Sequence, residues 1–180
     1  MKHSVESLLE HDHESLDQVL NQLDEELAKP NVVRAFELLD FFWARLAVHI
    51  RGENLHLFPA IESAPTSLFT GKDGFPTRKE AQSVLARLRS DHDFFMKELA
   101  QIVKIMRESV ASETMRPEEV KDVKQRITAI ARRLEAHNRL EETQAYKWPA
   151  LLLDENGIVE LCDRLRHELE NLPPRFLQKA

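Results

Sequence analysis

Four histidines and two glutamates interrupt otherwise regular apolar series along this 180-residue chain. Imidazole nitrogens and carboxylate oxygens together form a donor set that suits iron, manganese and zinc. Two of the histidines are followed four residues later by a glutamate, which puts both side chains of a pair on one face of a helix. The sequence therefore predicts a metal site with six ligands: His13, His49, Glu53, His92, His137 and Glu141.

Four long helices are predicted to carry these ligands, because apolar residues recur at alternating spacings of three and four. Their expected ranges are Ser4 to Lys29, Asn31 to Leu57, Thr77 to Ser112 and Pro117 to Pro149. Proline at 59 and at 149 is expected to end the second and fourth helices. Thr77 and Glu80 have the spacing of a capping box at the start of the third.

The depth of each histidine follows from counting residues to the nearest turn, since short connections make successive helices antiparallel. In the first hairpin the two counts are about 16 and 18, and in the second each is about 20. The four histidines are therefore predicted to lie in one layer of an all-α, up-down-up-down four-helix bundle. Isolated core histidines are the alternative, but buried carboxylates at the same level would be costly unless cations compensated them.

A shorter helix is predicted from about Ile158 to Asn171, with an apolar face of its own. We expect residues 1–155 to form the bundle and residues 156–180 to form this C-terminal helix and a tail. The helix either packs on the bundle or pairs two chains as a homodimer.

Composition excludes several other classes of protein. The single cysteine, Cys162, allows neither an internal disulfide nor a thiolate metal site. A net charge of −6, with acids and bases interspersed, argues against nucleic acid as a partner. No apolar run reaches the roughly 20 residues that span a bilayer, and no signal peptide is evident. We therefore expect no membrane partner and a cytoplasmic location.

The pattern resembles the hemerythrin-like, or HHE cation-binding, family, which has a histidine on helices one and three and His-xxx-Glu on helices two and four. The resemblance covers about Leu8 to Pro149 and includes Glu53-Asn-Leu-His-Leu-Phe-Pro59, similar to the acidic pair and Leu-Phe-Pro that often end the family's second helix. Met96 and Asn54 depart from it, standing where oxygen carriers place a second histidine and where many members carry a second glutamate.

The resemblance implies a hemerythrin-like bundle with two iron ions, or manganese or zinc in their place. In this arrangement His13 and His49 hold one ion, His92 and His137 hold the other, and both glutamates bridge. The implied function is to bind, sense or handle oxygen, peroxide or nitric oxide. Without a nucleophile or nucleotide-binding loop, any activity would be redox chemistry at the metals, and a role other than catalysis is favoured.

Other interpretations are kept as alternatives. A structural or partner-binding bundle, with zinc or no metal, is the main one, and iron storage, iron delivery and iron-cluster repair rank lower. Glu142 and His56 are additional candidate ligands. Glu142 is five residues after His137, as in oxygen carriers, but that spacing turns it about 140° off the stripe, so Glu141 is preferred.

Two further features carry structural predictions. Gly52 lies inside a helix, where glycine costs about 1 kcal/mol relative to alanine. It predicts the close approach of another helix or of a ligand beside Glu53, with a chance occurrence of glycine as the alternative. Five aromatic residues are predicted to pack in the apolar core rather than to transfer electrons: Phe41, Trp43, Phe94, Tyr146 and Trp148.

Overall fold

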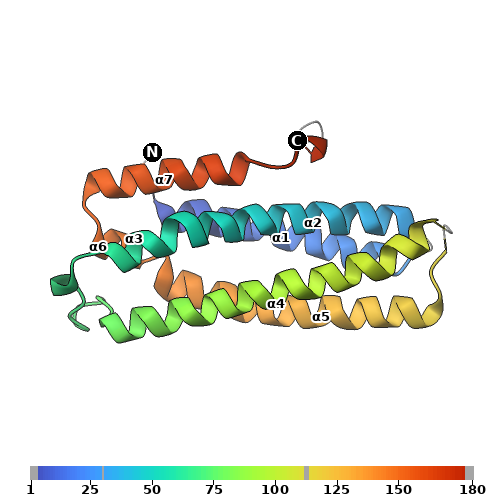
Figure 1. The fold of residues 1–180 in the computed structure, drawn as a ribbon, viewed down its shortest axis with the longest axis horizontal. Coiled ribbons are helices and arrows are strands. Elements are labelled where there is room, and N and C mark those ends of the chain that lie inside the picture. Colours follow the sequence, from blue (N-terminus) through green and yellow to red (C-terminus); the bar gives the residue numbers. More distant parts are fainter. Residues whose placement is uncertain (1–3, 30, 112–113, 177–180) are drawn as a thin grey trace.

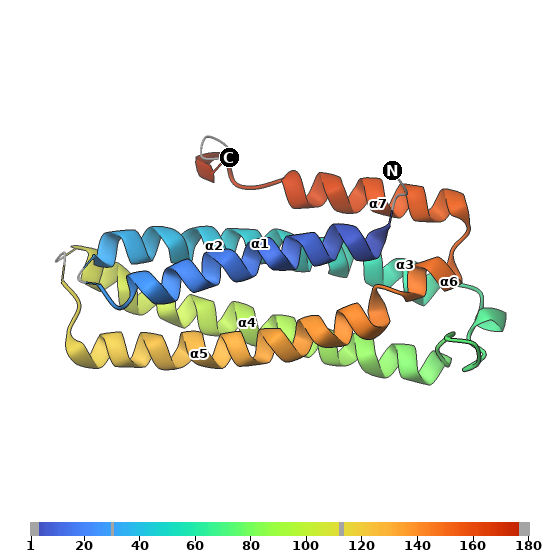
Figure 2. The ribbon, with the colours of Figure 1, turned by 180° about the vertical axis from the view of Figure 1, so that it is seen from behind.

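Four long helices lie side by side and run in alternating directions in the computed structural model, which describes residues 4–29, 31–111 and 114–176 (Figures 1 and 2). They are α1 (Val5–Glu26), α2 (Val32–Gly52), α4 (Arg78–Ala111) and α5 (Pro117–Leu140). This confirms the predicted all-α, up-down-up-down bundle. Pro30, between the first two expected helices, and Ser112, the expected end of the third, lie outside the described residues.

Local side-chain hydrogen bonds determine where several helices begin. The Ser4 hydroxyl accepts from the N–H of Ser7 at 3.3 Å, which satisfies an amide that has no partner within α1. At the start of α4, Glu80 accepts from the N–H of Thr77 at 2.8 Å, and the Thr77 hydroxyl accepts from the N–H of Glu80 at 3.1 Å. The predicted capping box is therefore confirmed.

The second and fourth α-helices end earlier than expected, at Gly52 and Leu140, and each is followed by further helical segments. A π-helical turn, η1 (Glu53–Leu57), leads from α2 into α3 (Phe58–Ser63). A second π-helical turn, η3 (Glu141–Ala145), follows α5 and precedes α6 (Trp148–Leu152). The prediction that proline ends both helices was wrong. Each proline lies in the first turn of a new α segment, where its missing N–H costs no hydrogen bond.

The connection between the two hairpins contains the short 3-10 helix η2 (Thr66–Leu68) and two glycines with positive φ, Gly71 at 68° and Gly74 at 86°. Glycine reaches these angles without the steric penalty of a Cβ atom. Arg78 holds the connection in place by donating to the carbonyls of Glu62 and Ala64. The loop is thereby fixed against the start of α4.

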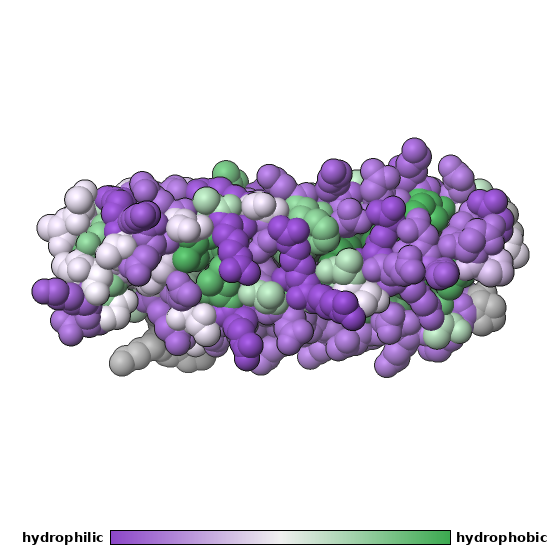
Figure 3. Space-filling model, turned by 90° about the horizontal axis from the view of Figure 1, so that it is seen from below, coloured by the Kyte–Doolittle hydropathy of each residue, from purple (hydrophilic) through white to green (hydrophobic). Residues whose placement is uncertain are grey.

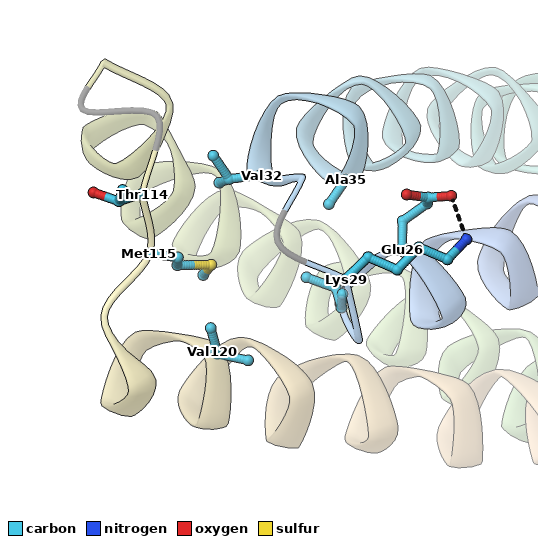
Figure 4. Close-up of a pocket in the computed structure, with 8 residues that line it drawn as sticks. Glu26, Lys29, Val32, Ala35, Thr114, Met115 and Val120 are labelled. Carbon is cyan, nitrogen blue, oxygen red and sulfur yellow. Dashed lines mark hydrogen bonds and ion pairs between the residues drawn. The ribbon is translucent and has the colours of Figure 1, made fainter.

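The apolar core consists of two clusters separated by a layer of buried polar residues. One cluster fills the half of the bundle toward the α1–α2 and α4–α5 turns, and includes Leu23, Phe42, Ile102 and Ile130. At its far end, a small pocket between the two turns is lined by apolar side chains such as Val32 and Met115, with Glu26 and Lys29 paired at 2.8 Å (Figure 4). The second cluster fills the other half and includes residues of α3, α6 and α7.

Helix α7 (Glu155–Glu170) lies along the side of the bundle formed by α1 and α2 (Figures 1 and 2). It buries Leu161, Cys162 and Leu165 against the bundle. A Cβ atom added at Gly52 would lie 3.4 Å from Cδ2 of Leu165, so this is a point of close contact between α2 and α7. The predicted close approach at Gly52 is confirmed, while the homodimer stays a prediction.

The outer face of α4 and α5 is largely hydrophilic, with apolar residues visible only in separate patches (Figure 3). None of the helices in the described ranges is both long and apolar enough to cross a membrane.

Substitutions at Gly52 should separate helix propensity from the packing of α7. We expect Gly52→Ala to stay within about 1 kcal/mol of the wild type, since better helix propensity offsets an ordinary contact at 3.4 Å. Gly52→Leu should destabilise by about 1–3 kcal/mol, because the larger side chain overlaps Leu165. Urea unfolding followed by circular dichroism measures both, and equal stability of the two variants would contradict this packing.

Candidate metal centre

The layer between the two apolar clusters contains all six predicted ligands, each at most 3% exposed. In one half, Nε2 of His13 lies 3.3 Å from Nε2 of His49 and 3.3 Å from Oε2 of Glu141. In the other half, Nε2 of His92 lies 3.1 Å from Oε2 of Glu53, and Nε2 of His137 lies 2.9 Å from Oε1 of Glu141. The histidines therefore meet in one layer, as the residue counts predicted.

The donor atoms form two adjacent groups, within each of which the atoms lie within 4.8 Å of one another. One group is His13, His49 and Glu141, and the other is Glu53, His92, His137 and Glu141. Glu141 belongs to both groups, with one oxygen facing each half. Oε2 of Glu53 also lies between the halves, 3.5 Å from Nε2 of His49 and 3.1 Å from Nε2 of His92.

The ring nitrogens that face away from the cluster have carboxylate partners in three of the four histidines. Asp12 accepts from Nδ1 of His49 at 2.9 Å, and Asp91 faces Nδ1 of His137 at 3.4 Å. Each aspartate is in turn paired with an arginine, Arg45 or Arg133. Such carboxylates fix the orientation of an imidazole and increase its basicity toward a metal.

Both hairpins thus contain Arg-xxx-His-xxx-Glu on one helix and Asp-His on its neighbour. The two arginines were not predicted as part of the site, although each stands four residues before a candidate histidine in the sequence.

Glu142 and His56, the two additional candidates, lie outside both donor groups. Glu142 is 38% exposed at its side chain and accepts from Nδ1 of His13 at 2.9 Å, so it is the outer partner of that histidine. Nε2 of His56 lies 3.7 Å from Oε2 of Glu168 on α7. Nδ1 of the remaining histidine, His92, has no hydrogen-bond partner among the described residues.

Tyr146 places its hydroxyl inside the cluster, a position that the sequence analysis did not predict. The phenol oxygen lies 2.7 Å from Oε1 of Glu53 and 3.0 Å from Oε2 of Glu141. It also lies 2.9 Å from Nε2 of His13 and 3.4 Å from Nε2 of His49. The ring is buried, as expected of a packing residue, but its oxygen belongs to the polar layer.

The π-helical turn explains how Tyr146 reaches the cluster. Its backbone N–H donates to the carbonyl of Glu141 at 2.9 Å, an i to i+5 hydrogen bond that places it about one turn beyond the glutamate. In an uninterrupted α-helix the same residue would point about 140° away. A signal was present in the sequence, because Phe58 and Tyr146 each follow a candidate glutamate by five residues.

In the cluster, the positive charge of protonated histidines and the negative charge of the glutamates compensate one another. Burial alone would lower the pKa of His49, but the Glu53 carboxylate and the hydrogen bond to Asp12 raise that pKa well above its ordinary value. Burial would also lower the pKa of His137, but the Glu141 carboxylate raises it above its ordinary value. Burial would raise the pKa of Glu53, but His49 and His92 lower it well below its usual range. Cationic histidines are therefore the natural partners of the two glutamates when no metal is bound.

The donor chemistry of the cluster fits a metal. Oε2 of Glu53, Nε2 of His92 and Oε1 of Glu141 are fully buried and make no well-aligned hydrogen bond among the described residues, although they lie within ion-pair distance of one another or of His137. Such atoms carry a free-energy cost of roughly 1–3 kcal/mol each if nothing satisfies them. Because these three are inward-facing donor atoms of one group, a cation bound there would satisfy them together.

The pKa shifts predict how the stability of the metal-free protein depends on pH. The raised pKa values of His49 and His137 contribute stability that is fully present below their ordinary value of 6.5 and is lost as the pH rises through the folded-state pKa values. The lowered pKa values of Glu53 and Glu141 contribute stability that is present above 4.5 and is lost on acidification. We expect the melting temperature of the metal-free protein to fall as the pH rises above about 6.5, and a flat profile would contradict these shifts.

The all-α bundle and its buried His/Glu cluster define a helical metal-binding protein. The family model of the hemerythrin HHE cation binding domain matches residues 4–148, and the chain therefore belongs to this family. Comparisons with curated proteins and with solved structures gave no match.

Proposed function

We propose that this chain is a non-haem di-metal protein that holds two iron ions and binds, senses or handles oxygen, peroxide or nitric oxide. The observation that carries the proposal is the pair of adjacent buried donor groups that share Glu141. Two ions in one layer would more than compensate the charge of the two buried carboxylates, and a mixed imidazole and carboxylate set suits iron, with manganese or zinc as alternatives.

Each residue has a distinct role in the proposed site. His13 and His49 would hold one ion, His92 and His137 would hold the other, and Glu53 and Glu141 would bridge them. Asp12 and Asp91 orient the imidazoles of His49 and His137 through their Nδ1 atoms.

The burial of the donors favours a small ligand. Because every donor residue is at most 3% exposed, the protein can admit a diatomic molecule or peroxide more easily than a larger substrate. Bound iron would supply redox chemistry and open coordination positions. The surrounding side chains position the ligands and exclude bulk water. Sensing or reversible binding therefore ranks above catalysis, and iron storage, iron delivery and iron-cluster repair rank lower.

Metal analysis and optical spectroscopy test the proposal directly. Protein expressed in iron-supplemented medium and purified without chelator should contain two metal ions per chain and absorb as an iron protein. His13→Ala should lose the ion of the first group and His137→Ala that of the second, so each variant serves as the control for the other. A wild-type chain with zinc or no metal, and no change in its spectrum with oxygen, peroxide or nitric oxide, would favour a structural or partner-binding bundle.

The oligomeric state, the location and the partners of the chain are further proposals. A homodimer through α7 would have to use the outer side of that helix, since its apolar face is buried against the bundle. A cytoplasmic location, and the absence of nucleic-acid and membrane partners, stay predictions.

A further inference from the structure

Building on the proposed di-metal function, we propose that the phenol oxygen of Tyr146 is a ligand of the ion held by His13 and His49. The two metal positions would then differ chemically, with a tyrosine oxygen at one and none at the other.

The distances place the phenol oxygen among the donor atoms. It forms a nearly equilateral triangle with Nε2 of His13 and Nε2 of His49, with sides of 2.9, 3.4 and 3.3 Å. A second triangle, with Nε2 of His13 and Oε2 of Glu141, has sides of 2.9, 3.0 and 3.3 Å. Donors bound at about 2.0–2.2 Å to one ion lie roughly 3.0–3.5 Å apart, so these are the edges expected around a single metal.

The same triangles show that the hydroxyl does not occupy the place of the ion itself. If it did, the donors would surround it, and their mutual distances would greatly exceed their distances to it. Instead, the separation of the two imidazole nitrogens, 3.3 Å, is close to their distances from the phenol oxygen. The phenol oxygen of Tyr146 therefore lies where a further donor atom of the same metal would lie.

Hydrogen bonding alone leaves the position of this oxygen incompletely explained. A neutral phenol has one proton to donate, yet carboxylate oxygens of Glu53 and Glu141 lie 2.7 and 3.0 Å away. Coordination resolves this crowding, because a cation next to all three oxygens compensates their charge. As the bond to the metal forms, the O–H bond breaks and the proton leaves by way of the Glu53 carboxylate, which accepts it at 2.7 Å and passes it on to solvent.

The second metal position has an aromatic ring without an oxygen. Phe58 follows Glu53 as Tyr146 follows Glu141, and its backbone N–H donates to the Glu53 carbonyl across the equivalent π-helical turn. The Phe58 ring stacks on His92, with ring centroids 5.8 Å apart and an interplanar angle of 4°. The internal repeat thus has phenylalanine where the first position has tyrosine.

The experiment uses the fact that Tyr146 is the sole tyrosine of the chain. The wild type, Tyr146→Phe and the neighbouring control Trp148→Phe are loaded with iron(III) and examined by optical and resonance Raman spectroscopy. We expect a visible phenolate-to-iron band and tyrosine vibrations in the wild type and the control, and complete loss of both in Tyr146→Phe. Loading with gallium(III), which has no redox activity, should give an ultraviolet tyrosinate difference spectrum in the same two proteins only.

The outcomes separate this proposal from the proposed function. Two bound ions in the wild type with neither a phenolate band nor a tyrosinate difference spectrum would overturn the role of Tyr146 and leave the di-metal site standing. A wild type that binds no metal would overturn both proposals. If Tyr146→Phe does not fold, the wild-type spectra still decide, since no other residue can supply the phenolate.

Discussion

Alanine at Glu141 should empty both metal positions, whereas alanine at Glu142 should leave the protein able to bind metal. One oxygen of Glu141 faces His13 and the other faces His137, so its removal takes a donor from each group and leaves Nε2 of these two histidines without the carboxylate that they face. Among the four histidines of the cluster, Glu142 is paired with His13 alone, at its outer Nδ1, and loss of an outer partner of this kind costs about tenfold to a hundredfold in metal affinity. Metal content after dialysis, followed by titration of the metal-free protein, measures both effects.

Two controls make this comparison informative. Circular dichroism shows whether each variant remains helical, and Glu141→Gln keeps the size of the side chain while removing its charge. If Glu142→Ala emptied the site and Glu141→Ala did not, the fourth helix would use the i+5 acid of the oxygen carriers, and the donor groups described above would be wrong.

Removal of metal should lower the melting temperature by about 10 °C or more. An ion that binds only the folded chain, at a concentration about 1,000 times its dissociation constant, adds about 4 kcal/mol to the free energy of unfolding. For a chain of this size, each kcal/mol corresponds to roughly 2–4 °C. Calorimetry of the loaded protein, the chelated protein and the chelated protein after metal is restored measures the shift and its reversibility.

The matched control is a chain that lacks one donor from each half, His13→Ala with His137→Ala. Its melting temperature should respond little to chelator, since it has little metal to lose. An equal response in this variant and in the wild type would mean that the chelator acts elsewhere, and an unchanged wild type after verified metal removal would favour the partner-binding bundle.

Helical periodicity was sufficient to predict the bundle and its cluster. Each of the six predicted ligands lies on an apolar stripe, and a helix with 3.6 residues per turn directs every residue of a stripe to the same side. Short turns then fix how deep each histidine lies, which is why the inward positions of His13, His49, His92 and His137 were predictable from counting. The capping box at Thr77 was also predictable, because both of its hydrogen bonds join residues three apart.

Tertiary structure decided the features that depart from this regular geometry. The π-helical turns that begin at Glu53 and Glu141 change the direction of the residues that follow, so the Tyr146 hydroxyl enters the cluster, and new α segments begin at Phe58 and Trp148. Counting residues along an unbroken α-helix therefore gives the wrong direction for the side chains that follow these turns. The roles of Glu142 and α7 were equally hidden, because an outer acceptor or an apolar face acquires its partner only when distant segments pack together.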